Sequence, residues 1–247
     1  MIGAIIQARM GSSRLPGKVL KEIGNKTLLE FQIDRIRQAS SLQKVIVATS
    51  TKKADDPIEK YCFTNNILCF RGPENDVLSR YFECASFYKL TTIIRLTADC
   101  PFTDPEIIDK VVNLFFEQGV DYCSNTVPPD TSHWPDGSDV EVFSFQALER
   151  AHKESIKADD REHVTFYFWQ EQSHRFKTAQ LLNNNDWSKY RFTVDYPEDL
   201  KVVNLLSNEI KSRNVFGHIE EIINILKDRP DIKKLNEQYY FGLGWKQ

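Results

Sequence analysis

The stretch that decides the fold is residues 2–18, IGAIIQARMGSSRLPGK. Residues 2–6 are almost entirely apolar, which is typical of a strand buried on both faces of a parallel sheet. The residues after them bring two glycines, two serines, a proline and three cations, Arg9, Arg14 and Lys18. Glycine lets backbone N–H groups approach a ligand closely, and fixed cations attract an anion. A buried strand that leads into such a loop predicts a phosphate-binding site.

Two common phosphate-binding motifs do not fit this loop. The spacing from Gly11 to Gly17 is too long for the nucleotide-binding P-loop, and Val19 follows Lys18 where serine or threonine is required. The dinucleotide-binding pattern G-x-G-x-x-G is also missing from the sequence. The alternative to an anion site is an ordinary basic surface turn.

Composition and charge limit the class of protein. The 247 residues are 41% hydrophobic and 27% charged, which fits one α/β domain with a small appendage. A net charge of −3 argues against a general nucleic-acid binder. No apolar stretch approaches the roughly 20 residues that span a bilayer, and the N-terminus reads as a strand and not as a signal peptide. Five scattered cysteines without a C-x-x-C pair indicate reduced thiols in a cytoplasmic protein.

Strands alternate with helices over the first 120 residues. Further apolar strands are predicted at residues 44–51, 67–70 and 92–97, with helical patterns between them. This alternation predicts a doubly wound, mostly parallel sheet. Beyond residue 121 we predict short strands at 139–143, 176–182 and 191–194, and helices at 145–157, 160–172, from 195 and beyond 215.

Three acidic residues are predicted at helix starts. Thr27 and Glu30 have the spacing of a capping box, and Asp104 before a proline reads as an N-cap. Asp76 begins another helix, and its spacing from Arg80 predicts a surface ion pair.

Several polar residues stand at or just past the ends of predicted strands. Ligands of doubly wound sheets bind at the carboxyl ends of the strands, so these residues are candidates for a common site. They are Arg9, Thr49, Ser50, Arg71 and Asp99.

Two aspartates at strand ends are candidate metal ligands. Asp99 follows the strand at 92–97, and Asp195 follows the short strand at 191–194. Mg²⁺ is usually held by one or two carboxylates together with phosphate oxygens and water. The alternative for each aspartate is a helix cap, although Asp104 already fills that position after Asp99. Nothing in the spacing shows that Asp99 and Asp195 meet.

Three motifs resemble one enzyme family. Residues 8–20, ARMGSSRLPGKVL, closely resemble the signature of the cytidylyltransferases that make CMP-activated 3-deoxy-octulosonate and sialic-acid-like sugars, especially the branch named for spore-coat polysaccharide biosynthesis. LTADCP at 96–101 and VDYPEDL at 194–200 look like the family motifs whose aspartates, here Asp99 and Asp195, contact magnesium. The resemblance implies a nucleotide-diphospho-sugar transferase fold of the GT-A-like kind, with a small mixed β extension.

The resemblance also implies an organisation of the chain and of its site. We expect a single domain over 1–247, with a nucleotide-binding half at 1–120, an acceptor-binding half at 121–200 and a helical C-terminal segment at 201–247. Arg9, Lys18 and Asp99 are the expected catalytic residues. The expected nucleotide-binding residues are Ala8, Arg9, Gly11, Ser12, Ser13, Arg14, Lys18, Thr49, Ser50 and Arg71.

A polar patch in the second half is the candidate acceptor site. Asp136, Asp139 and Glu141 are three carboxylates within six residues, and carboxylates hydrogen-bond well to sugar hydroxyls or amines. Trp134 beside them is expected to stack on a sugar ring. Arg161, at a predicted helix start, could bind an anionic acceptor or have a structural role.

These features and the resemblance together predict a Mg²⁺-dependent nucleotidyltransferase that acts on a sugar or sugar acid and releases pyrophosphate. The resemblance alone implies that CMP is transferred from CTP and that the product serves surface polysaccharide synthesis. One alternative is a GT-A-type glycosyltransferase, although Asp99-Cys100-Pro101 lacks the second aspartate of a D-x-D motif. The other is a non-catalytic nucleotide-binding regulatory domain.

The expected partners are CTP and a sugar-type acceptor, without nucleic acid or membrane. The related enzymes are often homodimers, and the aromatic tail could serve such a contact or cap the core of its own domain. The tail residues are Tyr239, Tyr240, Phe241 and Trp245.

Overall fold

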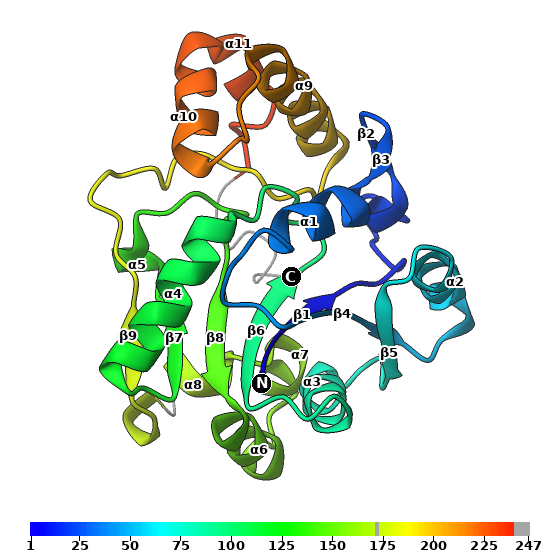
Figure 1. Ribbon diagram of the computed structural model, residues 1–247, viewed down its shortest axis with the longest axis vertical. Helices are drawn as coiled ribbons and strands as arrows, with labels where there is room; N and C mark the ends of the chain where they lie inside the picture. Colours follow the sequence, from blue (N-terminus) through cyan, green and yellow to red (C-terminus); the bar gives the residue numbers. More distant parts are fainter. Residues whose placement is uncertain (171–172, 240–247) are drawn as a thin grey trace.

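Strand β1 (Ile2–Gln7) lies in the middle of the main sheet, and its four inner residues are buried. The structure is a computed structural model that describes residues 1–170 and 173–239. The main sheet has seven strands in the order β5-β4-β1-β6-β8-β7-β9, and β2 and β3 form a separate pair (Figure 1). The other strands are β2 Glu22–Ile23, β3 Lys26–Thr27, β4 Lys44–Ser50, β5 Leu68–Gly72, β6 Thr92–Thr97, β7 Tyr122–Ser124, β8 Glu141–Ser144 and β9 Thr178–Gln180.

The direction in which the sheet grows reverses at β1. The chain crosses from β1 through α1 to β4 and then through α2 to β5 at the sheet edge, all in parallel. It returns through α3 and places β6 on the opposite side of β1, with Gln7 paired to Thr97. Because ligands of such sheets bind where the strand order reverses, the ends of β1 and β6 define the expected crevice. The predicted doubly wound, mostly parallel sheet is confirmed.

The second half of the sheet is mixed, as the resemblance implied. β8 runs antiparallel to β6 and places Glu141 opposite Arg95, while β7 pairs antiparallel with β8 and parallel with β9. Two local predictions are wrong. The strand expected at 191–194 is reduced to a single bridge between Asp136 and Arg191. The helix expected at 160–172 is interrupted at Val164, which gives two short helices.

The helices cover both faces of the sheet, and α9, α10 and α11 gather at one end of the molecule (Figure 1). None of the helices within the described ranges is long and apolar enough to cross a membrane. They are α1 Leu28–Ile36, α2 Asp56–Thr64, α3 Val77–Phe87, α4 Pro105–Gln118, α5 Pro129–Ser132, α6 Phe145–Glu154, α7 Ala158–His163, α8 Phe166–Trp169, α9 Pro197–Arg213, α10 Ile219–Asp228 and α11 Pro230–Lys233, with 3-10 turns η1 Lys18–Leu20, η2 Lys53–Asp55 and η3 Ser173–Arg175.

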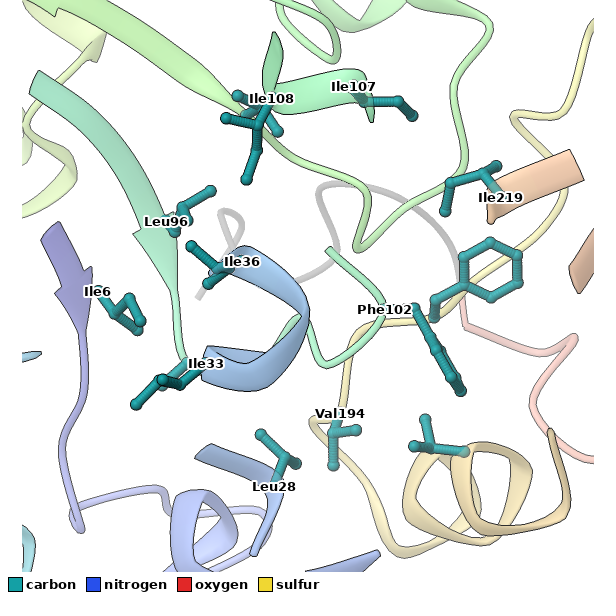
Figure 2. Packing of buried hydrophobic residues seen from close by; sticks show 14 of the residues in the cluster. Ile6, Leu28, Ile33, Ile36, Leu96, Phe102, Ile107, Ile108, Val194 and Ile219 are labelled. Atoms are coloured by element: carbon teal, nitrogen blue, oxygen red, sulfur yellow. The ribbon is translucent and has the colours of Figure 1, made fainter. Parts of the chain in front are cut away.

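Adjacent residues of β1 enter two different hydrophobic clusters. Ile6 packs in one cluster with Ile33 of α1 and Ile108 of α4 (Figure 2). Ile5 faces the other side of the sheet and packs with Leu78 of α3. Successive side chains of a strand point to opposite faces, so a continuous apolar run is buried on both sides.

Side-chain caps fix where helices begin. The Thr27 hydroxyl accepts a hydrogen bond from the Glu30 N–H, and Asp104 accepts one from the Glu106 N–H, as the sequence predicted for both helix starts. Asp76 caps α3, but its predicted pairing with Arg80 is wrong. The Arg80 side chain is buried, and it donates to the carbonyls of residues 73 and 74 instead of pairing with Asp76.

The aromatic tail is described only in part. The Tyr239 ring stacks on Tyr196 with a centroid separation of 3.9 Å. The other tail residues, Tyr240, Phe241 and Trp245, lie outside the described residues, so the predicted dimer contact stays a prediction.

Arg35 of α1 holds the C-terminal helices to the sheet domain. Its guanidinium is buried and donates to the carbonyls of Thr103, Phe216 and Gly217 over 2.8–3.2 Å. Burial lowers the pKa of Arg35 to about 10, so the side chain remains a cation at neutral pH. The three carbonyls belong to the start of α4 and the start of α10, and one side chain therefore connects three elements.

Arg35→Met should lower the free energy of unfolding by about 2–4 kcal/mol, because three buried carbonyls lose a charged donor. Arg37→Met, at the exposed end of the same helix, should change it by less than about 0.5 kcal/mol. Urea denaturation of both variants measures the difference. Equal effects would show that the Arg35 contacts do not hold the segments together.

Candidate active site

The loop after β1 folds back on itself through its own backbone. The N–H of Gly17 donates to the Met10 carbonyl at 3.1 Å, and the N–H of Leu15 donates to the Ser12 hydroxyl at 3.2 Å. Gly17 has φ of +67°, which glycine adopts without strain, and it precedes the 3-10 turn η1. The turn begins with Lys18, so the folded loop directs this side chain back toward the sheet.

Lys18 joins the ends of two distant segments. Its ammonium donates to Asp99 Oδ2 and to Asp195 Oδ1, both at 2.8 Å. The Val194 N–H also donates to the Asp99 carbonyl at 2.8 Å, which ties the two segments through the backbone. The structure therefore brings together the two candidate metal ligands that sequence spacing could not connect.

The charges of this cluster stabilise one another. Burial lowers the pKa of Lys18, but the two carboxylates outweigh it and raise the pKa above its usual range. Burial raises the pKa of Asp99, but the Lys18 ammonium outweighs it and holds the pKa below its usual range. Asp195 has two more cationic neighbours, Arg14 at 3.2 Å and Arg191 at 2.9 Å. Lys18 and Asp99 are therefore both charged at neutral pH.

A cavity of about 360 Å³ lies along the loop, and we call it the loop cavity. It reaches from the loop to Asp99 and Asp195. Gln7, which the sequence did not single out, and Glu162, the neighbour of the acceptor candidate Arg161, also line it. The expected nucleotide-binding residues found here are Arg9, Gly11, Ser12, Ser13, Arg14 and Lys18.

A second cavity of about 240 Å³, the carboxylate cavity, begins where the loop cavity ends. Asp99 and Asp195 line both cavities. The expected acceptor residues Asp136, Asp139 and Glu141 line the second one. The two aspartates thus join the cavity along the basic loop to the cavity lined by the expected acceptor residues.

Two arginines form ion pairs with most of the carboxylates that line the carboxylate cavity. Arg95 of β6 contacts Glu141, which also accepts a hydrogen bond from a buried tyrosine hydroxyl. Arg191 contacts Asp136 and Asp195 and holds Asp199 at 3.0 Å. The sequence offered a signal for Arg95, because an arginine inside the otherwise apolar strand at 92–97 needs a buried partner.

Asp139 is bound by neutral donors. Its carboxylate accepts from the Thr126 hydroxyl at 2.8 Å and from the Gly137 N–H at 2.9 Å. Burial raises its pKa to about 6, and the nearby charges of Glu141 and Asp99 add to this although the two hydrogen bonds oppose it.

Four of the expected nucleotide-binding residues line neither cavity. Ala8 and Thr49 are buried, with 1% and 0% of their surface exposed. Arg71 donates to the Ser50 carbonyl and forms ion pairs on α2. Ser50 binds Asp55, which accepts the N–H of Met10 at 2.7 Å. Ser50 therefore supports the loop after β1 indirectly, through Asp55.

Two expected acceptor contacts are occupied elsewhere. Arg161 donates to Asp76 and to the Ser79 hydroxyl, so it has the structural role that the sequence left open. Trp134 is 9% exposed, packs edge-on against Trp187, and lies outside the carboxylate cavity. Its predicted stacking on a sugar ring therefore has no counterpart at this cavity.

The donor set at the junction of the cavities fits magnesium. Asp99 and Asp195 offer two hard carboxylates, and their side chains are 26% and 18% exposed, so they can be reached from the cavities. In the described part of the chain, no group of three histidine, cysteine, aspartate or glutamate side chains is arranged to hold a metal. Two carboxylates suffice for Mg²⁺ only when phosphate oxygens or water complete the coordination. A metal here would therefore be shared with a phosphate-bearing ligand.

Comparison with known proteins identifies the family. A family model described as cytidylyltransferase matches residues 3–239. The chain belongs to this family. It is similar to the spore coat polysaccharide biosynthesis protein SpsF of Bacillus subtilis, with 35% identity over 92% of this chain and 94% of that protein. The resemblance found in the sequence is confirmed.

Solved structures agree with this assignment. A cytidylyltransferase from Leptospira borgpetersenii superposes with a TM-score of 0.88 and 33% identity, over 97% of this chain and 98% of that one. A CMP:2-keto-3-deoxy-manno-octonic acid synthetase complexed with CTP shares the fold, with a TM-score of 0.65 and 16% identity over 84% and 98% of the two chains. This cytidylyltransferase is therefore an enzyme with the expected nucleotidyltransferase fold.

Gly137 decides how closely the two walls of the carboxylate cavity approach. It has φ of +91°, and a Cβ there would meet the Thr193 backbone and lie 2.7 Å from the Phe192 carbonyl carbon. Gly119 has a similar conformation, φ of +56°, but nothing lies within 4 Å of its Cβ position. Alanine substitutions at the two glycines therefore distinguish the cost of backbone strain from the cost of a steric clash.

Gly137→Ala should lower the free energy of unfolding by about 2–4 kcal/mol, from strain plus a backbone clash. Gly119→Ala should lower it by only about 1–2 kcal/mol, from strain alone. Chemical denaturation measures both values. If the two variants lose equal stability, the close approach at Gly137 does not constrain the cavity.

Proposed function

We propose that this cytidylyltransferase transfers CMP from CTP to a hydroxyl or phosphate group of a sugar or sugar acid, with Mg²⁺, and releases pyrophosphate. Its product would be an activated sugar for surface polysaccharide synthesis. The observation that carries this proposal is the meeting of two cavities at Asp99 and Asp195. One cavity is lined by the basic loop, which suits a triphosphate, and the other by carboxylates, which suit sugar hydroxyls or amines.

The relatives support the choice of nucleotide and acceptor. The synthetase in the solved complex is bound to CTP, and its name includes a sugar acid. The Bacillus subtilis relative is named for polysaccharide biosynthesis. The family therefore favours CTP over the other nucleoside triphosphates for this chain, and it disfavours both the glycosyltransferase and the non-catalytic alternative.

The loop would bind the triphosphate through charge and backbone donors. Arg9 and Lys18 supply cations, and nothing lies within 4 Å of the position that a Cβ would occupy at Gly11, so the loop has open space for a ligand there. Asp99 and Asp195 would hold Mg²⁺, which neutralises phosphate charge as the transition state forms.

The chemistry is then an in-line displacement. The acceptor oxygen, held in the carboxylate cavity, attacks the α-phosphorus and forms the new O–P bond. The bond to the β-phosphate breaks, and pyrophosphate leaves along the loop. Catalysis by the protein consists mainly of positioning and charge neutralisation.

A pyrophosphate-release assay tests the nucleotide and the acceptor together. The protein is incubated with Mg²⁺, each of the four nucleoside triphosphates, and a panel of sugar acids, neutral sugars, amino sugars and sugar phosphates. We expect release with CTP and at least one acceptor. Release with UTP or GTP but never with CTP would contradict the assignment to CTP.

Asp99→Asn tests the metal role. The variant keeps the side-chain shape but loses the charge, so kcat/KM should fall at least about 100-fold, as for other lost transition-state charge contacts. Asp109→Asn is the matched control, because the hydrogen bonds of Asp109 in the described part of the chain go to the serines after α1, and it lies outside both cavities. An active Asp99→Asn enzyme with unchanged Mg²⁺ dependence would remove Asp99 from the metal site.

A further inference from the structure

The segment between α7 and α8 contains a strained turn. Val164 has φ of +63° and ψ of −57°, and the Thr165 N–H donates to the His163 carbonyl at 2.6 Å. These values define the γ-turn with positive φ, which is rare and strained, above all at a β-branched residue. The Val164 side chain is fully buried in the hydrophobic cluster under α3, and this packing holds the turn. Strain of this kind concentrates at functional sites.

The strained turn places three side chains at the carboxylate cavity. His163, Thr165 and Phe166 all line it, together with Asp99 and its neighbours. The imidazole of His163 is partly buried and stacks on the Phe166 ring, with centroids 4.3 Å apart and planes 24° apart. Stacking fixes the ring plane. Within residues 1–170 and 173–239, no hydrogen bond reaches a ring nitrogen of His163, so both nitrogens remain for a ligand.

Charged groups surround this histidine from three elements. Glu162 and Asp159 lie on its own helix, Arg95 on β6, and Arg9 in the loop after β1. Burial lowers the pKa of His163 below its usual range, and the two arginines act in the same direction against the two carboxylates. The imidazole is therefore neutral at neutral pH and able to accept a proton.

We infer that His163 is a catalytic residue that accepts the proton of the acceptor hydroxyl during transfer. The acceptor O–H bond breaks and its proton moves to an imidazole nitrogen, while the oxygen forms its bond to the α-phosphorus. The bond to the β-phosphate breaks, and pyrophosphate carries away the electron pair. The nearby Glu162 and Asp159 stabilise the imidazolium that forms, and the proton then passes to solvent.

The pH dependence of kcat distinguishes this role from a structural one. The inference rests on the proposed function, so the assay uses CTP, Mg²⁺ and the fastest hydroxyl acceptor of the panel described above. In the wild-type enzyme kcat should fall as the pH drops through the lowered pKa of His163, because the protonated ring cannot act as a base. His163→Gln should lower kcat by about 10²- to 10⁴-fold and remove this acid limb, with the KM for CTP nearly unchanged.

His174→Gln is the matched control, because His174 is exposed on η3 and outside both cavities. It should leave kcat and the acid limb unchanged, and thermal unfolding of both variants should confirm that they fold. A His163→Gln enzyme that keeps its kcat, or that loses kcat but retains the acid limb, would overturn the inference while leaving the proposed function intact.

Two results with the wild-type enzyme also test the role inferred for His163. Turnover of sugar phosphates alone would overturn the inference, since an ionised phosphate nucleophile has no proton to lose. No product with any acceptor would contradict the proposed function and, with it, the role of His163.

Discussion

The site depends on one ammonium group held between two carboxylates. Lys18 contacts Asp99 and Asp195 at 2.8 Å each, although 81 and 177 residues separate it from them along the chain. Without a cation between them, the two carboxylates would repel each other across a partly buried space. The bridge fixes the loop after β1 against the end of β6 and against the segment before α9. Under the proposed function, it would hold the groups for a triphosphate and its metal in place before any substrate arrives.

The topology of the sheet explains why these groups converge. β1 and β6 are neighbours at the point where the strand order reverses. The chain therefore turns in opposite directions after the two strands, and a crevice forms above their ends. The sequence was sufficient to predict this part. The apolar run at 2–6, the abrupt change to a basic loop, and an aspartate at the end of another apolar strand are all local signals. Each is readable without knowledge of the partner across the site.

The rest of the site depends on long-range pairing, which local patterns do not contain. Thr49 and Arg71 also lie near the ends of strands, in β4 and β5, yet burial and ion pairs on α2 keep them from the cavities. Arg161 has the charge of an anion-binding residue but pairs with Asp76, 85 residues away. Arg191 lies in a stretch expected to be a strand. Its ion pairs with three aspartates depend on the fold, which brings them around it. Helical periodicity also concealed the turn at Val164, where tertiary packing overrides local preference.

Under the proposed function, Asp99 and Asp195 would share a divalent cation with the triphosphate on the loop. Calorimetric titration of CTP into the protein, with Mg²⁺ or with a chelator, tests it without any acceptor. We predict that Mg²⁺ tightens CTP binding by about tenfold or more in the wild type, and that Asp195→Asn loses most of this coupling. Equal CTP affinity with Mg²⁺ and with the chelator in the wild-type protein would contradict the account.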